Sequence, residues 1–350
     1  MRIAGRWIEF RNRGPHESRA SCTLGGILAT LFLLSAHLKG HAEDFILFNG
    51  MCDASAAVAL DGQFFVVADD EENVLRIYRR SGGNAVVEVP LNPFLSGGGG
   101  APEADLEGGA MMDDFIFWIG SHGLSAKGNN RPGRQVFFAT RIDRTGGGTK
   151  LQPVGRVYRH LILSFAQDRR LNDFHLEYAA TIPPKQKDGL NIEGLTATPD
   201  GHLLIAFRNP IPDGKALLVP LLNPVEVIED APARLGDPIL LDLGGLGIRS
   251  IGYHKDRYLI IAGAIDGRNE SRLYEWKGVG HAPTPVKGIN LAGLNPEGIS
   301  FQLKNGRTEY LVLSDDGRKT VAGQDCKTLS NPEQKHFRGT VFSIDHGADR

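Results

Sequence analysis

The chain has 350 residues, of which 41% are hydrophobic, so it can fill a core and is not globally disordered. Its 44 Gly and 19 Pro, with aromatic and β-branched residues in short runs, favour many short strands joined by turns. A formal net charge of −2, without a basic stretch beyond the N-terminal leader, argues against nucleic acid as a partner.

Residues 1–42 have the pattern of a secretory signal peptide. Five arginines precede an apolar run at positions 24–36, and small residues stand at −3 and −1 of a cleavage point before Glu43. The run is shorter than the roughly 20 residues of a membrane-spanning helix, although an uncleaved N-terminal anchor stays open as an alternative. We therefore expect a periplasmic or secreted protein.

Removal of the leader leaves a chain with a net charge near −6, which anionic lipid head groups would repel. We expect no membrane contact after the signal is removed.

The two remaining cysteines are Cys52 and Cys326, near the two ends of the shortened chain. In a ring-shaped fold these ends meet, and an oxidising compartment permits a disulfide that closes the ring. Two buried free thiols are the alternative.

A motif recurs five times along the chain, at 53–56 (DASA), 105–108 (DLEG), 191–194 (NIEG), 247–250 (GIRS) and 295–298 (NPEG). Each motif is followed by an apolar strand, predicted at 64–68, 115–120, 203–207, 258–262 and 310–314. A further strand is predicted at 74–78, 135–142, 216–221, 272–276 and 339–344. The motifs start 52, 86, 56 and 48 residues apart, which is close to the length of a four-stranded propeller blade.

These repeats predict an all-β fold, a β-propeller with five recognisable blades. It is expected to occupy residues 43–350 as a single domain and not as two separate β domains, because every repeat needs neighbours to bury its faces. The 86-residue spacing implies an insertion around 145–188, in which residues 157–178 could form a helix or hide a degenerate sixth blade. A strand at 45–48 precedes the first motif and is expected to complete the last blade and close the ring.

The motifs resemble a bacterial family known as domain of unknown function 3616 over about residues 45–340. The segments that carry the resemblance are 53–55 (DAS), 68–71 (ADDE), 103–108 (EADLEG), 120–122 (GSH), 191–195 (NIEGL), 207–210 (FRNP), 243–245 (LGG) and 313–317 (LSDDG). More distantly, the repeated Glu-Gly start is similar to phytase-like and gluconolactonase-like propellers. That similarity implies acidic side chains at the channel that bind calcium or another divalent ion.

Side chains at equivalent positions of the first strand of each blade should converge on the central channel. The third motif position supplies Ser55, Glu107, Glu193, Arg249 and Glu297. The first motif position supplies Asp53, Asp105, Asn191, Gly247 and Asn295. Converging glutamates repel one another unless a cation neutralises them, and Ca²⁺ accepts carboxylate and amide oxygens in flexible number. We expect the three glutamates, two aspartates and two asparagines to bind a divalent cation, calcium by preference.

Other interpretations of these channel residues stay open. Arg249 could neutralise part of the negative charge. Each glutamate could instead accept hydrogen bonds from the neighbouring blade, or the channel could be a pocket for a charged ligand. The glycine after each glutamate permits a bulge or a close approach of two backbones.

A second set of polar residues stands at the strand ends, comprising Asp69, Asp70, Glu71, Ser121, His122, Arg208, Asn209, Asp315 and Asp316. Strand ends of the same polarity should gather at one mouth of the channel. Asp70 and Asp315, with His122, are predicted to act as acid and base. Arg208 and Lys215 could hold an anion such as phosphate. Asp-Asp-Gly and Asn-Pro are also ordinary turn formers, so a structural origin remains an alternative.

The sequence leaves catalysis open. The leading interpretation is an exported propeller whose divalent cation, held by Glu107, Glu193 and Glu297, activates water or polarises the oxygen of a small anionic or esterified ligand. The alternative is a non-catalytic propeller that presents one face to a protein or an envelope polymer and uses its acidic channel structurally.

Overall fold

The computed structural model describes residues 45–97, 100–144, 150–268 and 270–344. The predicted signal peptide lies outside the described residues. The described residues form one compact unit. Within the described ranges, no helix is long and apolar enough to cross a membrane.

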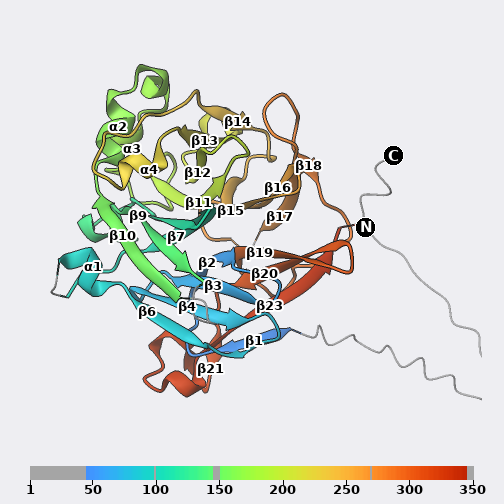
Figure 1. Ribbon diagram of the computed structural model, residues 1–350. Coiled ribbons are helices and arrows are strands. Elements are labelled where there is room, and N and C mark those ends of the chain that lie inside the picture. Colours follow the sequence, from blue (N-terminus) through green and yellow to red (C-terminus); the bar gives the residue numbers. More distant parts are fainter. Residues whose placement is uncertain (1–44, 98–99, 145–149, 269, 345–350) are drawn as a thin grey trace, which may run out of the picture. The chain divides into compact units, whose positions relative to one another are not determined.

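Five sheets are arranged as the blades of a β-propeller (Figure 1). The inner strands are β2 (Ala54–Ala59), β7 (Leu106–Met112), β11 (Asn191–Ala197), β15 (Gly247–His254) and β19 (Pro296–Lys304). Each inner strand contacts the inner strands of the two neighbouring blades, so the five surround a channel. The predicted all-β propeller with five blades is confirmed.

The second and third strands of each blade coincide with the predicted apolar runs. The second strands are β3 (Phe64–Asp69), β8 (Phe115–Gly120), β12 (Leu203–Asn209), β16 (Arg257–Gly263) and β20 (Arg307–Ser314). The third strands are β4 (Val74–Arg79), β9 (Phe137–Asp143), β13 (Ala216–Leu221), β17 (Ser271–Trp276) and β23 (His336–Ser343). Both faces of the second strands pack against neighbouring blades, which explains why these strands have continuous apolar sequences.

The outermost strands are β6 (Val87–Pro90), β10 (Lys150–Tyr158), β14 (Ile239–Leu241), β18 (Thr284–Pro285) and β1 (Ile46–Asn49). The last of these comes from the start of the described chain and pairs with β23 in the fifth blade, where β5 (Gly83–Asn84) adds a short parallel strand. Phe48 stacks on Phe337 and meets Phe65 and Tyr78 edge-on, so aromatic packing joins the fifth blade to the first. The predicted closure of the ring by an N-terminal strand is confirmed.

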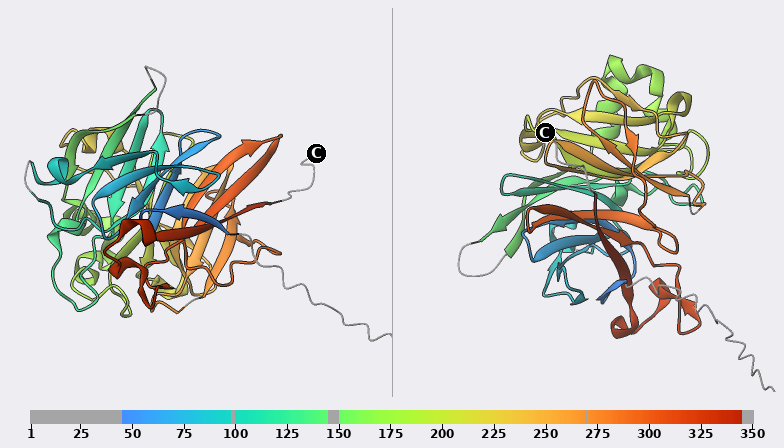
Figure 2. Two further views of the ribbon diagram at one scale, coloured as in Figure 1. Left: turned by 90° about the horizontal axis from the view of Figure 1, so that it is seen from below. Right: turned by 90° about the vertical axis from the view of Figure 1, so that its right-hand side faces the viewer.

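A disulfide between Cys52 and Cys326 adds a covalent link across the same closure, as predicted. It joins the start of the first blade to η4 (Cys326–Thr328), which follows the hairpin of β21 (Thr320–Val321) and β22 (Gln324–Asp325). Figure 2 shows this hairpin, in dark red, beside the blue strands at the start of the described chain. A short helix, η5 (Pro332–Gln334), then leads into β23.

The long spacing between the second and third motifs holds helices after β10. These are α2 (Leu161–Gln167), η2 (Arg169–Phe174) and α3 (Leu176–Ala179). Leu161, Phe165 and Leu176 pack in one apolar cluster with strands of the second and third blades. Within the described part of this spacing, the chain forms helices and not a sixth sheet. The remaining helical turns are α1 (Asn92–Ser96), η1 (Pro132–Arg134), η3 (Pro212–Gly214) and α4 (Pro224–Val227).

Every inner strand has a bulge at the third motif position. The pairing with the second strand skips Ser55, Glu107, Glu193, Arg249 and Glu297. A bulged residue has no partner opposite it, so its side chain is re-aimed out of the regular alternation. The glycine that follows allows close packing: a Cβ at Gly108 would stand 2.8 Å from the backbone nitrogen of Leu195 in the next blade.

Candidate functional site

A cavity of about 520 Å³ lies where the inner strands begin and the second strands end. Its lining from the first and third motif positions comprises Asp53, Asp105, Glu107, Asn191, Glu193, Arg249, Asn295 and Glu297. From the second predicted set, it includes Asp70, Glu71, Arg208, Asp315 and Asp316. The two sets meet because the start of each inner strand pairs with the end of the second strand, as Asn191 does with Asn209. They therefore form one site.

An acidic triad occupies the side of the cavity formed by the first two blades. Asp70 follows β3, while Asp105 and Glu107 stand at the start of β7, and one carboxylate oxygen from each lies within 4.8 Å of the other two. Asp70 Oδ1 is buried and has no hydrogen-bond partner. Hard carboxylate oxygens in this arrangement are ligands that Ca²⁺ or Mg²⁺ accepts.

The triad carboxylates are poorly suited to carry three negative charges without a cation. Burial, followed by the charge of Glu107, raises the pKa of Asp70 well above its usual range. Burial and the charge of Asp105 do the same to the pKa of Glu107. The pKa of Asp105 rises to about 7 because burial outweighs the opposing effects of Arg134 and Ser121. A bound cation would reverse these shifts by stabilising the charged forms.

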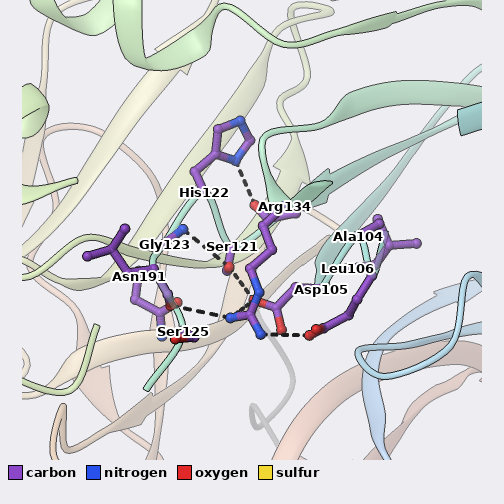
Figure 3. Close-up of polar contacts among 12 residues, drawn as sticks. Ala104, Asp105, Leu106, Ser121, His122, Gly123, Ser125, Arg134 and Asn191 are labelled. Atoms are coloured by element: carbon purple, nitrogen blue, oxygen red, sulfur yellow. Dashed lines mark hydrogen bonds and ion pairs between the residues drawn. The ribbon is translucent and has the colours of Figure 1, made fainter. Parts of the chain in front are cut away.

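Arg134 holds Asp105 from outside the triad (Figure 3). Its Nη1 lies 2.8 Å from Asp105 Oδ2, and its Nη2 lies 2.6 Å from Glu103 Oε1. The hydroxyl of Ser121 donates a hydrogen bond to the same Asp105 oxygen. These contacts fix the orientation of one potential ligand before any cation binds.

The other two predicted metal-binding glutamates are paired with arginines. Arg208 Nη1 donates to Glu193 Oε1 at 2.6 Å, and Arg249 Nε lies 3.6 Å from Glu193 Oε2. Arg249 also forms an ion pair with Glu297. All four side chains are buried, so these pairs neutralise Glu193 and Glu297 within the cavity. Glu107 belongs to the triad, whereas Glu193 and Glu297 are held by arginines.

The predicted asparagines take part in the same network. Asn191 Nδ2 donates to Glu193 Oε1 at 2.6 Å. Asn295 accepts a hydrogen bond from Arg249 Nη1 at 2.6 Å and donates one to Asp315 Oδ2 at 2.9 Å. The amide nitrogen of Asn191 and both polar atoms of the Asn295 amide therefore have protein partners.

Asp53 and Asp315 are bridge partners where the first and fifth blades meet. Burial, followed by the charges of Asp315 and Asp69, raises the pKa of Asp53 to about 8. Burial also raises the pKa of Asp315, although the backbone N–H of Gly317 donates to its Oδ1 at 2.8 Å. At neutral pH this part of the cavity can therefore hold a proton.

His122 does not line the cavity. Figure 3 shows its ring turned away from Asp105, and its Nδ1 lies 2.8 Å from the carbonyl oxygen of Gly120. Burial lowers its pKa to about 4, so the imidazole is neutral at physiological pH. Four further members of the predicted anion-binding and strand-end sets also lie outside the lining, namely Asp69, Ser121, Asn209 and Lys215. Lys215 is exposed, and Asn209 donates to the carbonyl oxygens of Pro184 and Gln186.

Six lysines and arginines that the sequence analysis did not single out line the cavity, namely Arg134, Lys185, Arg318, Lys319, Lys327 and Arg338. Lys185, Arg318 and Lys319 lie in loops that the other blades do not repeat, so no equivalent position in another blade could reveal them. Lys327 forms an ion pair with Glu71. The cavity therefore combines an acidic side with a cationic side, an arrangement able to hold a cation together with an anion.

Several solved structures are similar to this chain at low sequence identity and with TM-scores below 0.5. The glutaminyl cyclase of Myxococcus xanthus is 12% identical, with 85% of this chain and 95% of that chain covered and a TM-score of 0.42. A putative oxidoreductase (glucose dehydrogenase) of Thermus thermophilus is also 12% identical, with 85% and 100% covered and a TM-score of 0.41. The GH43_1 enzyme of Xanthomonas citri is 13% identical, with 88% and 93% covered and a TM-score of 0.44.

No curated protein matches the sequence. A family model described as protein of unknown function (DUF3616) matches residues 53–146 and 148–313. The match begins at the first repeated motif and extends into β20, so it includes all five inner strands. The chain therefore belongs to the DUF3616 family.

Proposed function

We propose that the protein is an exported, divalent-cation-binding hydrolase that acts on a small ester or phosphate ligand in the channel cavity. The observation that carries this proposal is the triad of Asp70, Asp105 and Glu107, whose oxygens lie within 4.8 Å of one another. The buried oxygen of Asp70 without a hydrogen-bond partner supports it, because a buried carboxylate oxygen normally has one.

Calcium fits the donor set best. Ca²⁺ takes six to eight oxygen ligands in flexible geometry, whereas Mg²⁺ demands near-ideal octahedral geometry. Three protein carboxylates would leave several coordination positions for water and for oxygens of the ligand. Such open positions are what a catalytic metal site requires, which supports the proposal.

A bound divalent cation would supply Lewis-acid polarisation of an ester or phosphoryl oxygen. The protein's own groups would manage the proton. Hydrolysis removes one proton from water and gives one to the leaving oxygen. Asp53, whose pKa is raised to about 8, can hold that proton at neutral pH in the same cavity. Arg208 and Arg249 also line the cavity, but their positive charges are balanced by Glu193 and Glu297, so they would add little net positive potential at the ligand.

Export is part of the proposal. The N-terminal sequence pattern of residues 1–42 supports it, and the Cys52–Cys326 disulfide is typical of proteins in oxidising compartments. We therefore assign the protein to the periplasm or the exterior of the cell.

The test begins with the metal content of the purified protein by elemental mass spectrometry and with a calcium titration by calorimetry. Asp70→Asn should lower the calcium affinity about tenfold or more. The matched control is Asp113→Asn, an exposed residue at the far end of β7 that should bind calcium like the wild type. Wild-type calcium affinity in Asp70→Asn would contradict the metal site.

Turnover on a panel of phosphate monoesters, carboxylic esters and lactones then tests hydrolysis. Activity that disappears both with chelator and in Asp70→Asn is expected. Calcium binding without turnover on any substrate would favour the alternative, a non-catalytic propeller that binds a protein or an envelope polymer.

A further inference from the structure

Three positively charged side chains in the cavity lining have no acidic partner among the described residues. They are Lys185, from the loop before β11, and Arg318 and Lys319, from the loop after β20. Elsewhere in the site, Arg134, Arg208 and Arg249 are all paired with carboxylates. Unpaired cations that face one cavity generate a positive potential that attracts an anion.

Lys185 lies close enough to Arg318 for the two positive charges to interact. Lys185 has a lowered pKa because of burial and because of the positive charges of Arg208 and Arg318. Its Nζ also reaches the loop after β16, since a Cβ at Gly267 would lie 3.7 Å from it. Lys185, from the insertion before β11, and Arg318, from the loop after β20, thus converge at the cavity.

The segment that carries Arg318 and Lys319 is fixed by backbone hydrogen bonds. The N–H of Asp316 donates to the carbonyl oxygen of Cys52 at 2.9 Å, and the N–H of Lys327 donates to that of Gly317 at 3.0 Å. The N–H of Cys326 donates to the carbonyl oxygen of Lys319, also at 2.9 Å. Residues 316–327 therefore form a closed loop whose two ends lie together at the cavity.

The disulfide anchors this loop to the acidic side of the site. Cys52 directly precedes Asp53, and Cys326 directly precedes Lys327, so the bond connects the neighbours of two residues that line the cavity. Both cysteines are buried, with exposed fractions of 1% and 0%. A reductant has no direct access to the sulfurs in the folded protein, so the bond acts as a fixed brace.

We propose that residues 316–327, braced by the Cys52–Cys326 disulfide, form the anion-binding wall of the cavity, where Arg318, Lys319 and Lys185 bind a phosphate-type oxyanion of the ligand. The inference rests on the proposed function, for which it names the ligand class and the subsite. The triad lies on β7 and after β3, outside the braced segment. Oxyanion affinity and calcium affinity should therefore respond to different substitutions.

Inorganic phosphate, titrated by calorimetry into the full-length protein in calcium-free buffer, is the first probe. Saturable binding is expected, and Arg318→Ala and Lys319→Ala should each weaken it about fivefold or more. Lys215→Ala, an exposed lysine outside the cavity, is the matched control and should bind phosphate like the wild type. Sodium chloride at equal ionic strength controls for nonspecific charge effects.

The double variant Cys52→Ser/Cys326→Ser tests the brace at a temperature where circular dichroism shows it folded. It should lose about fivefold or more in phosphate affinity and retain wild-type calcium affinity. Absence of phosphate binding, or unchanged affinity in Arg318→Ala and Lys319→Ala, would overturn the anion subsite. Since these substitutions lie at the surface, their result does not depend on the double variant folding.

The calcium titration separates this inference from the proposed function. Phosphate binding that depends on Arg318 and Lys319 in a protein without measurable calcium affinity would support the subsite and contradict the metal-dependent hydrolase. Calcium binding without phosphate binding would support the metal site and contradict the anion subsite.

Discussion

The carboxylate of Asp53 lies directly against the backbone of Gly317: a Cβ added at Gly317 would stand 1.7 Å from Asp53 Oδ1. Gly317 begins the loop that the disulfide braces, so only glycine allows the loop and the first blade to approach so closely. We expect Gly317→Ala to lower the free energy of unfolding by about 1–3 kcal/mol, as overpacking of a tight contact does. Urea denaturation measures this change.

Gly62→Ala is the control for that substitution. No atom lies within 4 Å of a Cβ built at Gly62, so the added methyl group meets open space. This variant should unfold at the same urea concentration as the wild type or at a slightly higher one, because alanine reduces the entropy of the unfolded chain. Equal stability of Gly317→Ala and Gly62→Ala would show that the loop can move away from Asp53 without cost.

Arg249 joins three blades through its contacts with Glu193 and Glu297. Arg249→Met would leave two buried carboxylates with less compensation, so we expect a loss of about 3–5 kcal/mol in the free energy of unfolding. The control is Arg156→Met, which removes an ion pair with Asp230 whose side chains are 73% and 56% exposed. Its effect should stay within about 0.5 kcal/mol. A similar effect of both substitutions would contradict the structural role of Arg249.

The repeated pattern was sufficient to predict the blades, because their second and third strands are buried between neighbours and have apolar sequences. The outermost strands gave no comparable signal: β14 has three residues and β18 has two. Pairing at the edge of each blade, and not side-chain burial, defines them. The disulfide was predictable because a ring brings distant ends together.

Most residues of the two predicted sets line the cavity, but the sequence did not reveal how they pair. Motif position identifies Glu107, Glu193 and Glu297 as channel residues, but it does not show that arginines neutralise the last two. Asp70 was assigned to a separate rim, since sequence does not reveal that the end of a second strand lies beside the next blade's inner strand. Lys185 and Arg318 belong to non-repeated loops, where spacing carries no information.

The stability of the calcium-free protein should fall as the pH rises from about 4 to about 8. Asp53 has a pKa of about 8 in the folded state against an ordinary value of 3.8, so between these two pH values the folded state binds more protons than the unfolded state. Stability then decreases with pH, by up to about 1.4 kcal/mol per unit for each such carboxyl group. Urea denaturation in chelator at pH 5, 6, 7 and 8 measures the slope.

Asp53→Asn should flatten this slope, because asparagine does not titrate, while Asp113→Asn at an exposed position should keep it. Stability that rises over this pH range in the wild type, or an unchanged slope in Asp53→Asn, would contradict the elevated pKa. Added calcium should also reduce the slope, because a cation at the triad favours the charged carboxylates.

Removal of the disulfide should cost stability as well as anion affinity. The bond closes a loop between residues 274 positions apart, and the chain-entropy argument gives about 5 kcal/mol for a loop of this size. We expect Cys52→Ala/Cys326→Ala to shift the urea midpoint strongly downward and to steepen the dependence on denaturant, because the unfolded chain without the cross-link exposes more surface. The single variant Cys326→Ala should lose as much, since it also removes the bond. A loss below about 1 kcal/mol in both variants would mean that the pairing of β1 with β23 closes the ring by itself and that the bond serves only to place the loop at the cavity.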